Sequence, residues 1–191
     1  YNEVGRAIVS AINNGLESVD KITILPRSGY LGGYTSIAPN EDVITSGLVS
    51  KKYLLSKIEI ALAGRAAEIV VFGMNEITQY ASNDLTYSTR IAKEMVTKYG
   101  FSVIGPVCIN QDNDEVFLGN SLLRNKNLIA DKTSLTIDNE IISISKRSLK
   151  KAIDKIRRNR LLLEKIVDVL IIEETIDSDR FKKLTSDLLK I

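Results

Sequence analysis

The sequence contains no histidine in 191 residues, and this absence excludes several kinds of chemistry. Histidine is the most common general base near neutral pH and the most common protein ligand for zinc. Catalytic triads built on serine or cysteine usually need an imidazole, so we expect no such triad. The chain also lacks a Gly-x-x-x-x-Gly-Lys-Ser/Thr loop, and we therefore expect that it does not itself bind ATP.

Cysteine and long apolar runs are also scarce. The single cysteine, Cys108, cannot form a disulfide within the chain, which suits a reducing compartment. We expect Cys108 to be a small buried apolar residue. No stretch reaches the roughly 18 uncharged apolar residues of a membrane-spanning helix, and no secretory signal or transit peptide is visible. These absences predict that the domain itself is soluble.

No charge of one sign predominates. The chain has 26 lysine and arginine residues against 24 acidic residues, a net charge of +2. This balance predicts no strong attraction to nucleic acid or to an anionic membrane. Residues 146–160 form one local basic run, but few aromatic residues are interleaved for base stacking. We interpret this run as the solvated face of a long helix and expect no nucleic-acid partner.

The apolar residues that are present predict a mainly α-helical domain with a small β-sheet. Helical spacing covers residues 1–14, the stretch from Ser50 to Gly73, residues 82–100, and residues 131–172 with a break at Asn159. A short helix follows Asp177. Residues 21–26 and 34–37 alternate as two strands of a hairpin. We expect one domain, residues 1–191, with a compact helical body over residues 1–130 and a long C-terminal helical arm over residues 131–191.

The order of motifs along the chain resembles one family. Residues 1–9 read Tyr-Asn-Glu-Val-Gly-Arg-Ala-Ile-Val, and residues 63–68 read Ala-Gly-Arg-Ala-Ala-Glu. Ala-Ser-Asn-Asp-Leu follows at 81–85, Val-Phe-Leu-Gly at 116–119 and Glu-Glu-Thr-Ile-Asp at 173–177. The whole series resembles the peptidase domain of FtsH-type ATP-dependent zinc metalloproteases. The segments Gly-Gly-Tyr-Thr at 32–35 and Ala-Pro-Asn-Glu at 38–41 are most similar to those of plastid or cyanobacterial members.

The resemblance implies a zinc site that this chain has altered. In the family, two histidines four residues apart on one helical face bind zinc, the glutamate after the first acts on the metal-bound water, and an aspartate completes the site. The corresponding ligand positions here are Asn2, Arg6 and Asp84, and Glu3 is the vestigial general base. An asparagine amide is a poor zinc ligand, and an arginine guanidinium has no lone pair to offer. We therefore expect no metal and no cofactor, although zinc is the cofactor of the family.

Two further expectations concern the former zinc site. Tyr80 stands where the family usually has glycine, and its ring would crowd the substrate cleft. Arg6 could supply the positive charge that zinc would otherwise give and bridge Glu3 and Asp84, because two unneutralised carboxylates in a partly buried pocket are costly. The alternative is that Arg6 points into solvent and that Glu3 is merely tolerated.

For function, the favoured hypothesis is a catalytically inactive pseudo-peptidase domain. It would serve assembly in a membrane-associated AAA-protease-type ring involved in protein quality control, as a homo- or hetero-hexamer with FtsH-like subunits. The resemblance implies unfolded or membrane proteins as substrates and attachment to a thylakoid or inner membrane through a region outside this chain. Two alternatives remain open: an active ATP-dependent zinc metalloendopeptidase with an aberrant site, and a stand-alone module that binds substrates or adaptors.

Overall fold

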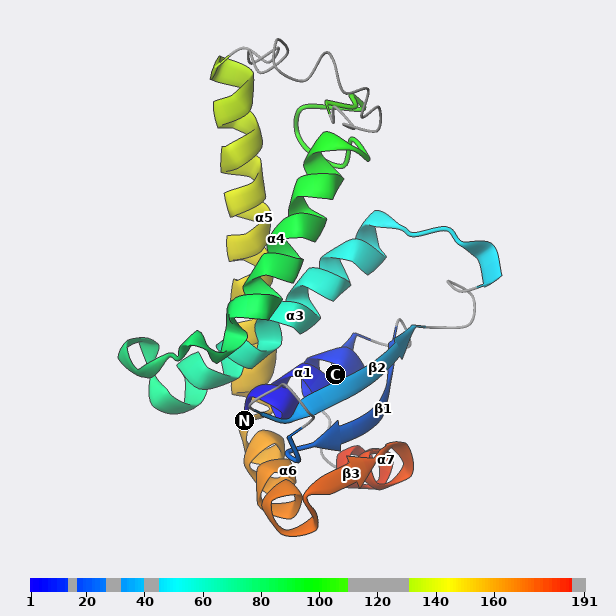
Figure 1. Ribbon diagram of the computed structural model, residues 1–191, viewed down its shortest axis with the longest axis vertical. Coiled ribbons are helices and arrows are strands. Elements are labelled where there is room, and N and C mark those ends of the chain that lie inside the picture. The colour runs from blue at the N-terminus through cyan, green and yellow to red at the C-terminus, as the bar shows by residue number, and fades with distance from the viewer. Residues whose placement is uncertain (14–16, 27–31, 40–44, 110–130, 187–191) are drawn as a thin grey trace, which may run out of the picture.

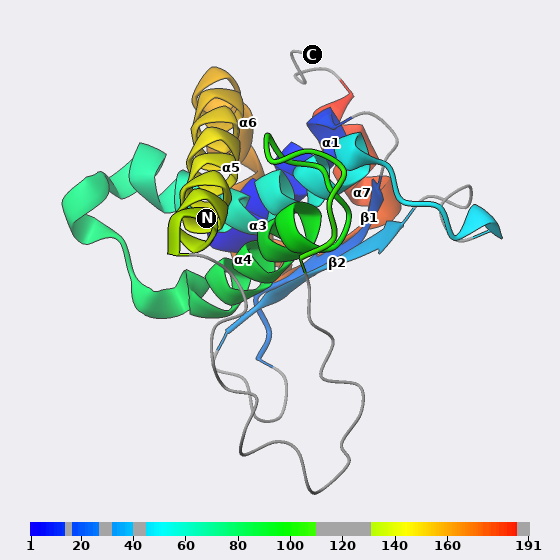
Figure 2. The same ribbon diagram turned by 90° about the horizontal axis from the view of Figure 1, so that it is seen from above.

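We describe a computed structural model of the chain for residues 1–13, 17–26, 32–39, 45–109 and 131–186. Within these residues the fold is mainly helical with a small antiparallel sheet, as the sequence predicts. Helix α1 (Asn2–Ile12) lies between the sheet and α3 (Lys51–Phe72), and α3 also packs against α4 (Ser82–Thr97) and α5 (Asp131–Arg158). Figures 1 and 2 show α1 in this central position.

The sheet has the strand order β2-β1-β3. Strand β1 (Glu17–Thr23) pairs antiparallel with β2 (Tyr34–Pro39), which confirms the predicted hairpin, although β1 begins and ends earlier than the predicted residues 21–26. Strand β3 (Thr175–Asp177) pairs with the other edge of β1, so that Ile22 lies opposite Ile176. This third strand was not predicted, and it ties the C-terminal part of the chain to the N-terminal hairpin.

The helix boundaries follow local chemistry. The Ser50 side chain accepts a hydrogen bond from the backbone N–H of Tyr53 and caps α3, and α3 ends before Gly73, whose φ of 91° suits glycine. Asn159 separates α5 from α6 (Arg160–Glu173), which confirms the predicted break. Asp177 caps α7 (Ser178–Thr185). Two short 3-10 turns, η1 (Met74–Glu76) and η2 (Gln79–Ala81), connect α3 to α4.

The C-terminal helices share their core with the N-terminal part of the chain. In one apolar cluster, Val4 and Ile8 of α1 lie with Ile156 of α5, Leu163 of α6 and Phe181 of α7. A second cluster joins α3, α4 and α5. Residues 131–158 form the long helix α5, which packs against both α3 and α4 (Figure 1).

One local expectation was wrong. Cys108 is exposed rather than buried, since the irregular segment that carries it lies at the surface. The motif at 116–119 lies outside the described residues.

Candidate functional site

Helix α1 places the residues of the first motif next to α3 and α4. Its close approach to α3 depends on Gly5, where an added Cβ would lie 2.8 Å from the Ala67 Cβ and 2.9 Å from the Ala63 carbonyl oxygen. Asn2 and Glu3 are buried, with 9% and 7% of their surfaces exposed. The first turn of α1 therefore presents its polar residues to the interior, where each needs a partner.

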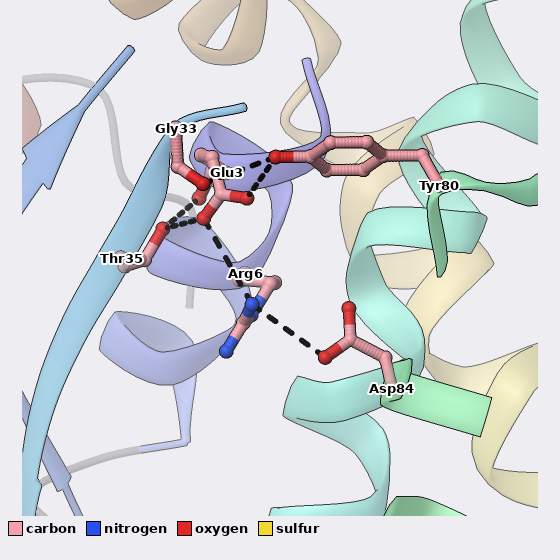
Figure 3. Close-up of polar contacts among 6 residues, drawn as sticks. All are labelled: Glu3, Arg6, Gly33, Thr35, Tyr80 and Asp84. Carbon is pink, nitrogen blue, oxygen red and sulfur yellow. Dashed lines mark hydrogen bonds and ion pairs between the residues drawn. The ribbon is translucent and has the colours of Figure 1, made fainter. Parts of the chain in front are cut away.

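Glu3 is held by two hydroxyl groups from different elements. The Thr35 hydroxyl of β2 lies 2.6 Å from Glu3 Oε2 and 2.9 Å from the Glu3 carbonyl oxygen. The Tyr80 hydroxyl of η2 lies 3.2 Å from Glu3 Oε1. Both carboxylate oxygens thus accept hydrogen bonds from neutral donors (Figure 3). This fixes the carboxylate against the sheet.

Arg6 lies between the two acidic residues, as the bridging hypothesis predicts. Its Nη1 is 3.5 Å from Asp84 Oδ1 and 3.9 Å from Glu3 Oε2 (Figure 3). A quarter of the Arg6 side chain is exposed, against 9% for Glu3 and 19% for Asp84. The alternative in which Arg6 points away into solvent is therefore wrong. The guanidinium neutralises part of the charge of both carboxylates at once.

Tyr80 spans the cleft between η2 and β2. Its hydroxyl lies 3.0 Å from the Gly33 carbonyl oxygen as well as near Glu3, and its ring lies where a Cβ on Gly32 would collide with it. Burial and the neighbouring Glu3 carboxylate raise the pKa of Tyr80 to about 12, so the hydroxyl stays a proton donor at neutral pH. The ring crowds the cleft, as expected from the sequence, and also fastens its two walls together.

Asp84 reaches the site from the first turn of α4, where a carboxylate interacts favourably with the helix macrodipole. Burial nevertheless raises the pKa of Asp84 above its ordinary value, and the Arg6 guanidinium offsets this only in part. The nearby Glu3 carboxylate adds to the rise. The ionised Asp84 carboxylate therefore lowers the stability of the fold, even with the Arg6 guanidinium beside it.

The four predicted positions do not form a ligand set for zinc. The structure brings Glu3, Arg6 and Asp84 together, whereas Asn2 packs against Gly64 of α3 and neither polar atom of its amide has a hydrogen-bond partner among the described residues. A cationic guanidinium occupies the space between the remaining carboxylates, and it cannot donate electrons to a metal. Within the described ranges, no group of three or more His, Cys, Asp or Glu residues could hold a metal ion. The residues present do not fit zinc.

The sequence did not reveal how Glu3 is held. Thr35 and Tyr80 bond to Glu3 across 32 and 77 residues of sequence. The sequence drew attention to both residues, because Thr35 belongs to the Gly-Gly-Tyr-Thr segment and Tyr80 departs from the family pattern. Neither feature indicated a bond to Glu3. Glu3 and Tyr80 line a cavity of about 760 Å³ together with Arg6, Asp84 and the Gly32-Gly33 segment.

Comparison with known proteins agrees with the motif order. The model of peptidase family M41 matches residues 1–184. The chain is 37% identical over 188 residues to the ATP-dependent zinc metalloprotease FtsH 3 of Synechocystis, with 98% of this chain and 30% of that protein covered. It is 35% identical over its whole length to the chloroplastic ATP-dependent zinc metalloprotease FTSH 8 of Arabidopsis thaliana, of which it covers 27%. It is 39% identical to an FtsH metalloprotease of Mesomycoplasma conjunctivae, with 98% of this chain and 24% of that protein covered.

The chain thus spans less than a third of the length of these relatives. None of the helices in the described part of the chain has the length and apolar character needed to cross a bilayer.

Proposed function

The chain belongs to peptidase family M41, and we propose that it is a pseudo-peptidase domain, which keeps the fold of the family without hydrolysing peptides. The observation that carries this proposal is the position of Arg6, within 4 Å of both Glu3 and Asp84. A metal ion at this place would have to displace a guanidinium that two carboxylates already bind. Without a metal to acidify a bound water, the site has no nucleophile for peptide hydrolysis.

Tyr80 supports the same conclusion from the substrate side. Its single hydroxyl proton is within hydrogen-bond distance of both Glu3 and the Gly33 carbonyl oxygen, so the side chain lies across the entrance to the former catalytic glutamate. Glu3 itself accepts bonds from Thr35 and Tyr80. A water at this carboxylate would have to approach beside these two donors.

We further propose that the domain serves assembly in a membrane-associated ring with FtsH-like subunits, as a homo- or hetero-hexamer. The retained core supports this, since α1, the sheet and α3 keep a continuous interior around the altered site. The chain covers less than a third of its relatives, so the proposal places an ATPase module and a membrane anchor in a region outside it. The cyanobacterial and chloroplastic relatives support a plastid or cyanobacterial membrane as the location.

Metal content is the first test. The purified chain is incubated with zinc and desalted, and zinc is measured by elemental analysis beside a casein-degradation assay of the full-length protein. We expect substoichiometric zinc and no degradation. Stoichiometric zinc together with casein cleavage would contradict the proposal and support an active enzyme with an aberrant site.

A reciprocal experiment asks whether the lost ligands alone explain the result. The double variant Asn2→His/Arg6→His restores both imidazoles beside Asp84, and we expect it to bind one zinc ion per chain. The matched control adds Asp84→Ala to the same variant and should lose most of that zinc. If the double variant binds no zinc although its circular dichroism is unchanged, then features beyond the two substituted positions have disabled the site.

The proposed assembly is tested separately. Analytical ultracentrifugation of the full-length protein, alone and with an FtsH subunit from the same source, should show a hexamer in at least one of the two samples. A protein that stays monomeric in both would contradict the ring proposal and favour a stand-alone binding module.

A further inference from the structure

A second cavity lies at the opposite end of α1 from Glu3. It has a volume of about 610 Å³, within the usual range for small-ligand pockets. Its lining comes from the C-terminal end of α1, the N-terminal half of α3 and the C-terminal half of α5: Ile12, Asn13, Lys51, Lys52, Leu55, Ser56, Glu59, Lys151 and Lys155. Since α1 is about 16 Å long, this cavity is separate from the altered peptidase site.

The lysines of α5 are held in place by a buried acid. Glu59 is only 5% exposed, and Lys151 and Lys155 each bring an ammonium group to one of its carboxylate oxygens, Lys151 at 3.3 Å. Lys155 also donates to the Asn13 side-chain oxygen. Most of the basic run is exposed, as the sequence predicts, but Lys151 and Lys155 also line the cavity and pair with Glu59.

The cavity has an excess of positive charge. Four lysines line it against a single glutamate, which leaves three positive charges uncompensated within the lining. Lys51 and Lys52 lie in the first turn of α3, which has no acidic residue. The N-terminal end of a helix already carries partial positive charge, so two lysines there repel it and an anion there would be stabilised.

We propose that this cavity is a binding site for a compact anion of more than one negative charge, with a phosphate group as the ligand that fits its chemistry. Lysine ammonium groups are common phosphate ligands, and Lys151 and Lys155 each still have at least one N–H group that bonds to neither Glu59 nor Asn13. The Ser56 hydroxyl accepts a hydrogen bond from the Asn13 side-chain nitrogen and can itself donate to an oxyanion. Leu55 and Ile12 give the cavity an apolar wall against which the rest of a phosphate ester would pack.

Bound at this position, the anion would connect α1, α3 and α5. Lys51 and Lys52 lie about a hundred residues from Lys151 and Lys155 in the sequence, and an anion between them would bridge the two parts of the chain. A ligand that binds only the folded state raises the free energy of unfolding, and the increase grows with the logarithm of the ligand concentration. The stability of the domain would therefore depend on the concentration of the anion.

The test is isothermal titration calorimetry of the full chain at physiological salt. The probes are inorganic orthophosphate, inorganic tripolyphosphate and citrate, which separates phosphate from carboxylate as the recognised group. We expect saturable binding of tripolyphosphate with a stoichiometry of one, weaker binding of orthophosphate, and the weakest binding of citrate. Binding should also weaken as salt rises, because much of it is electrostatic.

The variant Lys51→Ala/Lys52→Ala should weaken tripolyphosphate binding about tenfold, since two charges of several tenths of a kcal/mol each are removed. Both side chains are exposed and lie in the first turn of α3, so the fold should persist. The matched control is Lys182→Ala/Lys183→Ala, another exposed adjacent pair in a helix, which should bind as the unchanged chain does. Lys151→Gln gives an independent variant from α5 and should also weaken binding.

An equal loss in the control pair would overturn the proposal, because it would show general attraction to a basic surface. Binding that does not saturate, or that is unchanged in both Lys51→Ala/Lys52→Ala and Lys151→Gln, would overturn it as well. Neither result bears on zinc content, so this proposal and the pseudo-peptidase proposal fail independently.

Discussion

Replacing Arg6 by alanine should destabilise the fold by far more than loss of an ordinary surface arginine. The guanidinium is the cation within ion-pair distance of both Glu3 and Asp84. Its removal leaves two carboxylates in a partly buried pocket, with 9% and 19% of their side chains exposed. Removing one member of a buried charge set costs more than the pair contributes, because the remaining charge stays desolvated.

The size of the effect follows from the distances. At 3.5 and 3.9 Å, with an effective dielectric constant of about 20, each pair has a gross Coulomb energy of about 4 to 5 kcal/mol. Most of this is offset by the cost of desolvating the arginine, a quarter of whose side chain remains exposed. Breaking a fully buried pair costs about 3 to 5 kcal/mol, so removing the arginine of this mostly buried bridge, itself a quarter exposed, should cost about 2 kcal/mol. For a domain of this size the melting temperature should fall by about 4 to 8 °C.

Urea unfolding followed by circular dichroism at neutral pH measures the loss. The control is Arg160→Ala, because Arg160 bonds at 2.9 Å to Glu164 with about half of both side chains exposed. Such a pair is worth roughly 0.3 to 0.5 kcal/mol. Adding Asp84→Asn to Arg6→Ala should recover part of the stability, since it removes one of the stranded charges. If Arg6→Ala costs no more than Arg160→Ala, the charge-compensation argument is refuted.

Two titrations test the neighbouring groups. Burial raises the pKa of Asp84 in the fold, so its ionised form is destabilising and stability falls as pH rises through the native pKa. At neutral pH, the free energy of unfolding of Asp84→Asn in urea should therefore equal or exceed that of the unchanged chain. This difference should shrink as pH falls toward 3.8, the pKa of the unfolded chain. A difference that grows in acid would show that ionised Asp84 does not destabilise the fold. The pKa of Tyr80 is raised from 10.0 to about 12, so the fold should lose stability as pH rises from 10.0 to about 12. The tyrosinate absorbance of the native chain should include one group that ionises near pH 12, and Tyr80→Phe should remove it. If Tyr80→Phe instead removes a group that ionises near pH 10, the bond from Tyr80 to Glu3 is contradicted.

The elements that the sequence predicted correctly have strong local signals. The Ser50 cap, the glycine after Phe72 and the break at Asn159 each follow from the chemistry of one or two neighbouring residues. Strand β3 has only three residues and no alternation to detect, and it exists because Ile176 pairs opposite Ile22. Cys108 was misplaced because its exposure depends on the course of an irregular segment, which local composition does not determine.

The site shows the same division. The motif identified Glu3, Arg6 and Asp84, and charge balance suggested that the arginine bridges the two acids, but only the structure decides between this bridge and an arginine that points into solvent. The bonds from Thr35 and Tyr80 to Glu3 were not predicted, since they depend on how β2 and η2 approach α1 in three dimensions. The basic run is largely exposed, as predicted, but the contact of Lys155 with Glu59 was not predictable, because Glu59 lies 96 residues away on α3.

Under the pseudo-peptidase proposal, an arginine at a former metal-ligand position explains how the chain can lose the peptidase chemistry and keep the fold. A zinc site contributes both reactivity and positive charge, and a buried pair of carboxylates needs only the charge in order to remain stable. An arginine supplies the charge without the open coordination position or the acidified water. Under the pseudo-peptidase proposal, selection that keeps the interface and the core would therefore tolerate this exchange. Loss of both histidines without a compensating cation would instead leave Glu3 and Asp84 to destabilise the first turns of α1 and α4, which are the elements that hold the cleft together.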